Sequence, residues 1–131
     1  MKKIIFSILA LSLIAISSYC QEEVITPNEP HEWYEKVVKN FPDITTSWEN
    51  LSATIFQEGK LSIKEKHLIG LGIAVSMSCE GCITYHIGAA MEGGATKEEI
   101  LEAATVAIFM GGGPALVNIE NVINALEALS E

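Results

Sequence analysis

Apolar residues recur every three or four positions along most of the chain after residue 30, which is the period of an α-helix. No stretch of useful length alternates apolar and polar residues as a half-buried strand would. The pattern predicts six helices with short connections, over 31–41, 42–57, 62–77, 79–92, 96–110 and 114–129. Six helices without a strand indicate an all-α bundle.

Residues that favour helix ends stand at several of these boundaries. Two capping boxes, in which a serine or threonine precedes a glutamate by three positions, occur at 62–65 and 96–99. Ser78 is well placed to cap the helix that carries a cysteine pair. The glycine run 111–113 is expected to break the fifth helix, and Pro114 is expected to open the last one, where its missing N–H group is harmless.

The predicted helix 62–77 is apolar on nearly all sides, so we expect it to be central and buried. Its small residues Gly70, Gly72 and Ala74 allow neighbouring helices to approach closely. In the first two helices, Trp33 and Trp48 lie at helical spacing with other apolar residues and are expected to pack in the core.

The first 20 residues have the pattern of a secretory signal peptide. Lys2 and Lys3 form a short positive segment, residues 4–16 are apolar apart from two serines, and small or polar residues follow at 17–20. The apolar run is too short for a comfortable transmembrane helix, which needs about 20 residues. We therefore expect the chain to be exported.

Cys20 gives this signal two alternative outcomes. Cleavage after Cys20 would release a periplasmic or secreted chain, whereas a lipoprotein signal would make Cys20 the lipidated first residue of an anchored chain. The sequence thus predicts three parts: a signal peptide at 1–20, a flexible polar tether at 21–30, and a helical domain at 31–131.

The composition argues against nucleic acid as a partner and for an interface between subunits. Arginine is absent, and 17 acidic residues stand against 8 lysines. Because phosphate binding needs a basic surface, we expect no nucleic acid partner. Apolar residues make up 49% of the chain, which is high for a small exported domain and predicts that part of the surface lies in a subunit interface.

The residues with the clearest chemistry are Cys79, Cys82 and His86. On a helix their side chains fall within an arc of roughly 60° on one face. A cysteine near a helix N-terminus has a lowered thiol pKa, because the helix dipole and free N–H groups stabilise the thiolate. An imidazole one turn below Cys82 can accept its proton. The other thiol can then close a disulfide, through a sulfenic acid if the substrate is a peroxide.

Two other interpretations remain open on spacing alone. The same three side chains could be zinc ligands, with His67 as the fourth. Alternatively, the cysteines form an inert bridge or pack as buried residues, in a protein that is only an oligomeric interaction module. Export favours a disulfide at rest, since removal of residues 1–20 leaves this pair as the only cysteines.

Four segments carry a resemblance to a known family by their order and spacing. They are LSIKEKHLI at 61–69, CEGC at 79–82 followed by His86, GATKEEI at 94–100, and MGGGPA at 110–115. From residue 61 to 131, more than half of its length, the chain resembles the carboxymuconolactone decarboxylase family on its alkylhydroperoxidase AhpD-like side. Together the segments are specific for the family, though not for a substrate.

The resemblance implies an AhpD-like helical bundle that assembles into trimers or hexamers. It implies that Cys82 reacts with the peroxide and becomes the sulfenic acid, and that Cys79 donates a proton and resolves the intermediate. It places His86 in a proton relay. No cofactor is expected.

Two positions depart from the family pattern. The relay glutamate twelve residues before the first cysteine is His67 in this chain, where an imidazole would replace the carboxylate as proton acceptor. Glu65 lies about 200° round the helix from it and is not expected to take over. The histidine that precedes the second cysteine in well-known peroxidases of the family is Gly81.

We therefore expect an exported, all-helical, homo-oligomeric thiol oxidoreductase. It would reduce hydroperoxides or exchange disulfides through Cys82 and Cys79, with His86 as base and His67 in the relay. Its thiol reductant would be extracytoplasmic, and the sequence does not identify it. The alternative is a non-enzymatic or zinc-binding oligomeric member of the same family.

Overall fold

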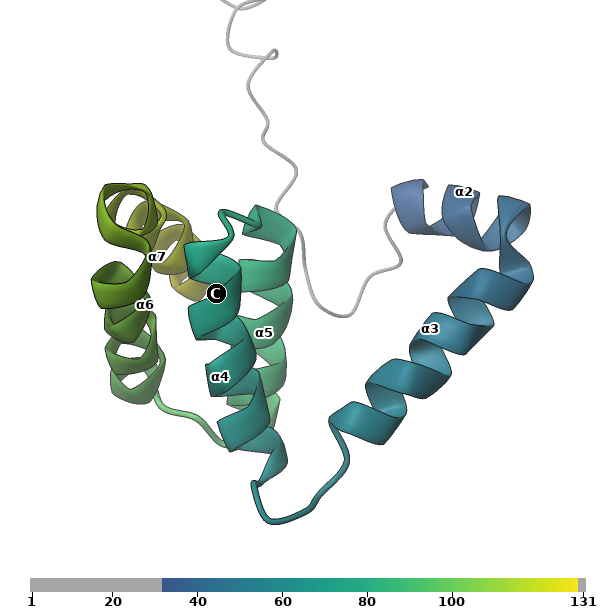
Figure 1. The fold of residues 1–131 in the computed structure, drawn as a ribbon, viewed down its shortest axis with the longest axis horizontal. Helices are drawn as coiled ribbons and strands as arrows, with labels where there is room; N and C mark the ends of the chain where they lie inside the picture. Colours follow the sequence, from purple (N-terminus) through teal and green to yellow (C-terminus); the bar gives the residue numbers. More distant parts are fainter. Residues whose placement is uncertain (1–31, 130–131) are drawn as a thin grey trace, which may run out of the picture.

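The computed structural model describes residues 32–129, and Figure 1 shows their fold. The predicted signal peptide at 1–20, with Cys20, and the predicted tether at 21–30 lie outside the described residues. Residues 32–129 form six α-helices and no strand, which confirms the all-α prediction. The helices are α2 (Glu32–Asn40), α3 (Pro42–Ile55), α4 (Ile63–Ser76), α5 (Glu80–Glu92), α6 (Lys97–Val117) and α7 (Ile119–Ala128).

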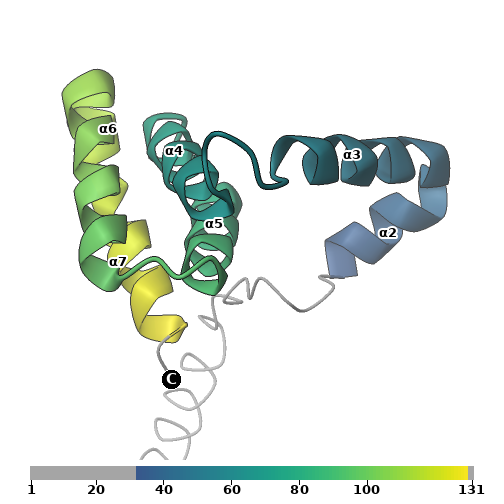
Figure 2. The same cartoon turned by 90° about the horizontal axis from the view of Figure 1, so that it is seen from below.

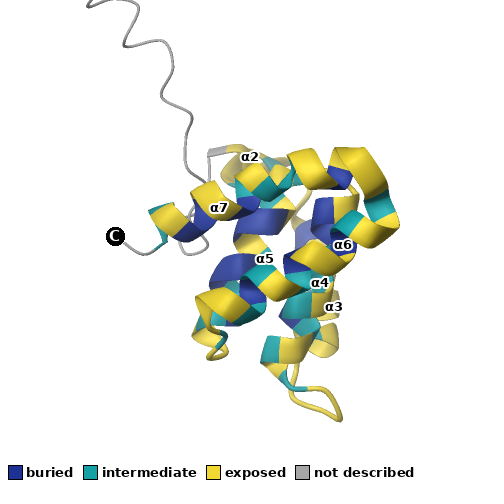
Figure 3. Ribbon diagram, turned by 90° about the vertical axis from the view of Figure 1, so that its left-hand side faces the viewer, coloured by how far each residue is buried: buried dark blue, intermediate teal, exposed yellow. Residues whose placement is uncertain are grey.

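The four helices α4 to α7 form a bundle (Figures 1 and 2). α4 packs against both α5 and α6, and α7 packs against the same two helices on their other side. The core is made by side chains with an exposed fraction below 2%, which Figure 3 shows in dark blue along the bundle helices. The largest of them are Leu71, Val75, Ile83, Ile87, Ile100, Val122 and Leu126. The bundle therefore buries a continuous apolar core of its own.

The helices α2 and α3 form an arm that extends away from the bundle (Figures 1 and 2). The phenol of Tyr34 on α2 donates a hydrogen bond of 2.5 Å to Glu49 Oε1 on α3. Thr45 is the buried residue of α3. The apolar stripe of α3 is about half exposed in every member: Ile44, Trp48, Leu51 and Ile55. Trp33 and Trp48 are 58% and 65% exposed, so the prediction that they pack in the core is wrong.

The base of the arm is fixed to α4. Lys66 Nζ donates hydrogen bonds of 2.7 Å to the carbonyl oxygens of Ile55 and Gln57, at the C-terminal end of α3. A cation at this end also interacts favourably with the helix dipole. Phe56, the C-cap of α3, stacks on His67 of α4. These contacts place the end of the arm beside the histidines.

Both predicted capping boxes are present. The side chains of Ser62 and Thr96 accept hydrogen bonds from the backbone N–H groups of Glu65 and Glu99, whose carboxylates accept from the cap residues in return. Glu99 also accepts a hydrogen bond of 2.8 Å from Lys64 Nζ, which joins the first turns of α4 and α6. Glu65 is therefore used at a helix end, consistent with its expected absence from the relay.

The connection between α4 and α5 differs from the prediction. Ser78 has a positive φ of 56°, and the N-cap of α5 is Cys79, not Ser78. The N–H groups of Ser78 and Cys79 bond to the carbonyl oxygens of Val75 and Ala74, at 3.2 and 3.1 Å. This is the Schellman pattern at the end of α4, which requires a left-handed residue where Ser78 stands. The Ser78 hydroxyl accepts a hydrogen bond of 2.7 Å from Asn118 Nδ2.

The glycine run interrupts α6, as predicted. Gly112 is non-helical, with φ 64° and ψ −144°, so two helical stretches meet at a kink, and the second carries the chain to Val117. Pro114 lies in this second stretch, and α7 begins after it at Ile119, so the single helix predicted from Pro114 onwards is divided at Asn118. A Cβ on Gly111 would lie 3.5 Å from Cα of Ser76, which shows how closely α6 approaches α4.

By length and composition alone, α6 is the one helix in the described part of the chain that could cross a membrane. Core helices of soluble proteins meet the same criteria, and α6 packs against α4 and α7 in the bundle. A membrane span therefore has only weak support.

Candidate functional site

A disulfide between Cys79 and Cys82 lies at the N-terminus of α5, with the two Cα atoms 5.2 Å apart. Cys79 is the N-cap, in extended conformation, and Cys82 lies within the first turn of the helix. Cys82 is exposed and Cys79 is half-buried. Because Cys79 stands outside the helix, the one-face arrangement predicted for three residues applies only to Cys82 and His86.

The structure brings His67 of α4 and His86 of α5 together. Their Nδ1 atoms lie 3.0 Å apart, which is hydrogen-bonding distance. One Nδ1 must donate and the other must accept, so the pair holds a single proton between these two atoms. His67 is 4% exposed and His86 is half-buried. His67, at the position where the family pattern has a glutamate, is thus in direct contact with the histidine that the resemblance places in a relay.

Gly70 makes room for this contact. It lies on the same side of α4 as His67, less than one turn further along the helix. A Cβ built on Gly70 would lie 2.6 Å from Cε1 of His86 and 2.8 Å from each of its ring nitrogens. The His86 ring therefore rests directly on the α4 backbone, in space that any side chain would occupy.

Two aromatic residues enclose the imidazoles. The rings of Phe56 and His67 are stacked, with centroids 4.3 Å apart and planes 11° apart. Tyr85 meets both histidines edge-on, with its centroid 5.8 Å from that of His67 and 5.1 Å from that of His86. Phe56 and Tyr85 thus exclude water from much of the imidazole surface.

Burial lowers the pKa of both histidines. Desolvation lowers the pKa of His67, against the opposing influence of the Glu92 carboxylate. Desolvation, and next the charge of His67, lower the pKa of His86 to about 4. Both rings are therefore neutral at pH 7 when the disulfide is closed, and each offers a nitrogen lone pair.

The described residues hold no group of three or more histidine, cysteine, aspartate or glutamate side chains placed to bind a metal ion. In the disulfide form, Cys79 and Cys82 have no thiolate to offer as ligand. The site thus consists of a closed disulfide at the N-terminus of α5 and two imidazoles in contact, one on α4 and one on α5.

Sequence reasoning missed Phe56 and the specific role of Gly70. Phe56 falls outside the apolar stripe of α3. The one indication in the sequence was an aromatic residue at the end of a helix that does not share the spacing of that stripe. Gly70 was expected to allow close approach, but the sequence does not name the ring that approaches. Tyr85 adjoins His86 in sequence, and its contacts with both imidazoles appear only in the fold.

Similar proteins point to one family. The family model described as carboxymuconolactone decarboxylase family matches residues 42–125. The chain is 31% identical over 102 residues to an uncharacterized protein of Methanocaldococcus jannaschii, covering 78% of this chain and 90% of the relative. It is 34% identical over 79 residues to an uncharacterized protein of the cox locus of Paracoccus denitrificans, covering 60% of this chain and 71% of the relative.

Solved structures agree. A carboxymuconolactone decarboxylase family protein from Legionella pneumophila is 35% identical with a TM-score of 0.70, covering 74% of this chain and 87% of that one. A Thermotoga maritima protein is 33% identical with a TM-score of 0.69, covering 76% and 89%. Because the family model matches more than half of the chain and the helical fold is AhpD-like, the chain belongs to the carboxymuconolactone decarboxylase family.

Proposed function

We propose that this protein is a thiol oxidoreductase that reduces hydroperoxides or exchanges disulfides through Cys82 and Cys79. The observation that carries the proposal is a disulfide at a helix N-terminus, on the same helix as one of two neutral imidazoles in mutual contact. The family includes both decarboxylases and alkylhydroperoxidases, so an enzymatic role agrees with membership.

The peroxidase cycle would run through three balanced steps. The Cys82 thiolate attacks the outer oxygen of ROOH, the O–O bond breaks, and the alkoxide takes a proton to leave as ROH. The Cys79 thiol then attacks the sulfenic acid sulfur, which forms the disulfide and releases water. Two thiols of an external reductant reopen the disulfide and are themselves oxidised to a disulfide.

Each neighbouring group has a distinct part in this cycle. The N-terminus of α5 stabilises a thiolate, since its free N–H groups and dipole favour negative charge. The pKa of about 4 at His86 belongs to the form without a thiolate. A thiolate formed on reduction would raise the His86 pKa by its opposite charge, so the imidazole becomes a better proton acceptor when one is needed.

Exposure gives the two sulfurs different access. Cys82 is exposed and Cys79 is half-buried, so a peroxide or a reducing thiol meets Cys82 first. This order supports Cys82 as the reacting cysteine and Cys79 as the resolving one. A Thermotoga maritima relative, 33% identical, is described as a candidate participant in an antioxidative response, which is compatible with this chemistry.

Peroxide consumption with dithiothreitol tests the proposal. Wild-type protein should consume cumene hydroperoxide, and Cys82→Ser should lose that activity. Reduced Cys79→Ser, assayed after dithiothreitol has been removed, should stop after one turnover with a sulfenic acid that dimedone traps. Ser76→Ala, an exposed substitution on α4, serves as the matched control. Equal rates in wild type and Cys82→Ser would rule out peroxide reduction.

A redox titration with thiol trapping covers disulfide exchange. A working couple should have a potential above about −300 mV, whereas a lower value would indicate an inert structural bridge. Zinc analysis of the reduced protein tests the alternative function. Roughly one zinc per chain, lost in Cys79→Ser, would favour a zinc-binding member over a redox protein.

We also propose that the chain is exported through the signal at 1–20. The support is the sequence pattern alone. Intact mass measured on protein from the extracytoplasmic fraction separates the outcomes: a chain beginning at Gln21, or a chain beginning at a lipidated Cys20. Retention of the full-length chain in the cytoplasm would contradict export.

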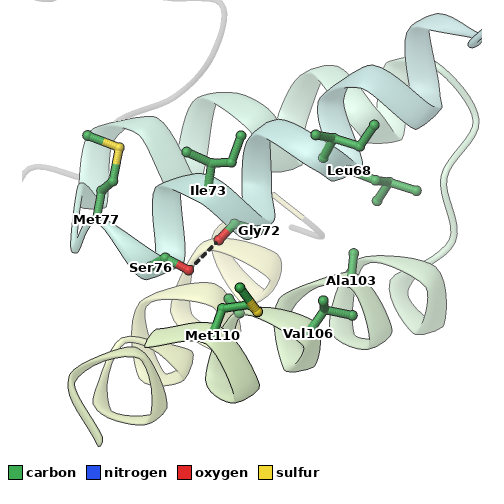
Figure 4. Close-up of a pocket in the computed structure, with 10 residues that line it drawn as sticks. Leu68, Gly72, Ile73, Ser76, Met77, Ala103, Val106 and Met110 are labelled. Atoms are coloured by element: carbon green, nitrogen blue, oxygen red, sulfur yellow. Dashed lines mark hydrogen bonds between the residues drawn. The ribbon is translucent and has the colours of Figure 1, made fainter. Parts of the chain in front are cut away.

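We propose that the protein is a homo-oligomer, because it exposes extensive apolar surface. One such surface is the stripe on α3. A second is a groove of about 520 Å³ between α4 and α6, shown in Figure 4. Its rim includes exposed Ile73, Met77, Val106 and Met110. A second copy of the chain offers matching apolar faces to both surfaces.

Molar mass by light scattering tests the assembly. Wild type should elute as a multiple of the chain mass, and Ile73→Glu or Trp48→Glu should shift it towards the monomer. Asn124→Glu introduces the same charge at an exposed polar position on α7 and should leave the mass unchanged. A monomeric wild type at working concentration would contradict the proposal.

A further inference from the structure

We propose that Gly70 is a positioning residue of the thiol site, whose absent side chain lets His86 reach His67. The inference deepens the proposed function, because it assigns to that site a residue that touches neither sulfur nor substrate. Its physical basis, the contact between two rings and one glycine, can be measured without any redox assay.

The geometry leaves His86 no other way to make the contact. Its ring atoms would lie between 2.6 and 2.8 Å from a Cβ on Gly70, distances below those that real Cβ atoms show. His67 projects from the same side of α4 and meets the ring at 3.0 Å. The ring is thus confined between the α4 backbone and His67, and a single methyl group would displace it.

Other neighbouring residues hold the His67 ring in place. Phe56 stacks on it, and Lys66 holds the segment that carries Phe56 by bonding to the carbonyls on either side. Tyr85 meets both rings from α5, and the Glu92 carboxylate acts electrostatically on His67. With His67 held in this way and Gly70 without a side chain, the His86 ring lies against the α4 backbone within 3.0 Å of His67 Nδ1.

Gly72 provides a matched control on the same helix. A Cβ on Gly72 would meet only the carbonyl oxygen of Ala103, at 3.7 Å, which is ordinary van der Waals contact. Alanine favours a helix interior over glycine. Gly72→Ala should therefore raise the melting temperature, whereas Gly70→Ala should lower it through the clash with His86.

Histidine ring NMR tests the inference directly in the intact oxidised protein, with His67→Gln and His86→Ala spectra to assign the signals. In wild type and Gly72→Ala, His86 should titrate near pH 4. In Gly70→Ala the displaced ring becomes hydrated, and its titration should move towards about 6.5, the value of a free imidazole. An unchanged His86 titration in folded Gly70→Ala would overturn the inference.

A double substitution keeps the test decisive if Gly70→Ala alone does not fold. Gly70→Ala with His86→Ala removes the ring that the methyl group meets, so this protein should fold even if Gly70→Ala alone does not. If Gly70→Ala does fold, the double variant should melt higher than the sum of the two single effects predicts. Additive effects, or failure of the double variant to fold, would overturn the inference.

Peroxide consumption separates this inference from the proposed function. If both hold, Gly70→Ala should lose activity to the level of His86→Ala, while Gly72→Ala retains it. If the wild type consumes no peroxide but the NMR shift occurs, the proposed peroxidase function fails and the positioning role of Gly70 stands. If Gly70→Ala keeps full activity with His86 displaced, the positioning role in the reaction fails and the peroxidase function stands.

Discussion

The arm and the bundle use similar apolar residues with opposite results. In the bundle, side chains such as Leu71 and Ile87 are completely buried by the other bundle helices. In the arm, Ile44 and Trp48 are each 65% exposed, although they form as regular a stripe. The bundle is therefore stabilised by burial within one chain, whereas burial among the described residues contributes little to the arm helices.

The two regions meet at the candidate site. Phe56 ends the arm and covers His67, while Gly70 and His86 belong to the bundle. The arm, which buries little apolar surface of its own, thus supplies Phe56 to cover His67. Among the described residues, His67 is the least exposed polar side chain. The difference between the regions can be tested by substitutions that are chemically identical in each.

The largest difference in stability is expected between two leucine-to-alanine substitutions, one in the bundle and one in the arm. Leu71→Ala in the bundle should reduce the free energy of unfolding by about 2–5 kcal/mol, since it removes a completely buried side chain. Leu51→Ala on the arm should change it by less than about 1 kcal/mol at low protein concentration, because Leu51 is already 51% exposed. Urea unfolding at two protein concentrations measures both. Equal losses at low concentration would mean that the arm is buried by its own chain.

The next largest effect is a loss of stability at low pH, caused by His86 at the site where arm and bundle meet. The folded pKa of His86 is about 4, below the ordinary value of 6.5, so the unfolded chain binds more protons between these values. Stability should fall as pH falls through that window, by about 2 kcal/mol between pH 7 and 5. Urea unfolding of wild type and His86→Ala measures this contribution.

The control for this pH effect is the shape of the His86→Ala profile. Several glutamates with lowered pKa values, including Glu65 and Glu99, reduce stability only at lower pH and act in both proteins. The two stability curves should therefore differ in slope from pH 5 to 7 and run parallel below pH 4. Identical slopes from pH 5 to 7 would show that His86 is hydrated in the folded protein.

A smaller difference is expected for one threonine in each region. Thr96→Ala removes the capping box of α6 and should reduce stability by about 1 kcal/mol. Thr54→Ala on α3 removes only the hydrogen bond that the threonine hydroxyl donates to the Asn50 carbonyl. It should stabilise the helix by about 0.5 kcal/mol and increase helicity slightly, because alanine favours a helix more than threonine does. Urea unfolding and far-ultraviolet circular dichroism measure the two effects. A loss of helicity in Thr54→Ala would mean that packing, not propensity, maintains the arm.

The smallest difference is expected between Asn118→Ala and Ser78→Gly. Asn118→Ala removes the hydrogen bond to the Ser78 hydroxyl, and also the bond to the Pro114 carbonyl and the bond from Asn121 Nδ2. Stability should fall by at least about 0.5–1.5 kcal/mol, the contribution of one typical hydrogen bond. Ser78→Gly loses the bond with Asn118 but gains a residue suited to positive φ, so its loss should be smaller. Thermal unfolding of the two variants gives the comparison. A greater loss in Ser78→Gly would mean that the hydrogen bond, rather than the left-handed backbone, dominates this connection.

Features that depend on residues close together in the sequence were predicted correctly. The spans of the first four helices, to within about two residues at each end, and the capping boxes at Ser62 and Thr96 are confirmed, because period and capping act within one or two turns. The wrong predictions concern features set at longer range. Ser78 adopts its conformation to close α4, and Asn118, forty positions away, bonds to it. No local pattern contains that contact.

The candidate site shows the same division. The spacing of Cys79, Cys82 and His86 was enough to identify a redox candidate, and His67 was named by its place in the family pattern. The 3.0 Å contact between the imidazoles and the cover by Phe56 could not be predicted, because both depend on how separate helices pack. A helical stripe likewise predicts the helix α3 but not the surface that covers it.

Cys79 is at once the last residue bonded to α4 and the N-cap of α5. Its N–H group bonds to the Ala74 carbonyl, and its own carbonyl accepts the N–H group of Ile83 at 2.9 Å. The connection therefore has no spare residue, and an insertion of one residue before Cys82 would turn it by about 100° round the helix. Opening and closing the disulfide should leave this backbone in place, so amide exchange at Cys79 and Ile83 should be equal in both redox states. The couple would then work as a rigid element, in which only side chains reorganise during each turnover.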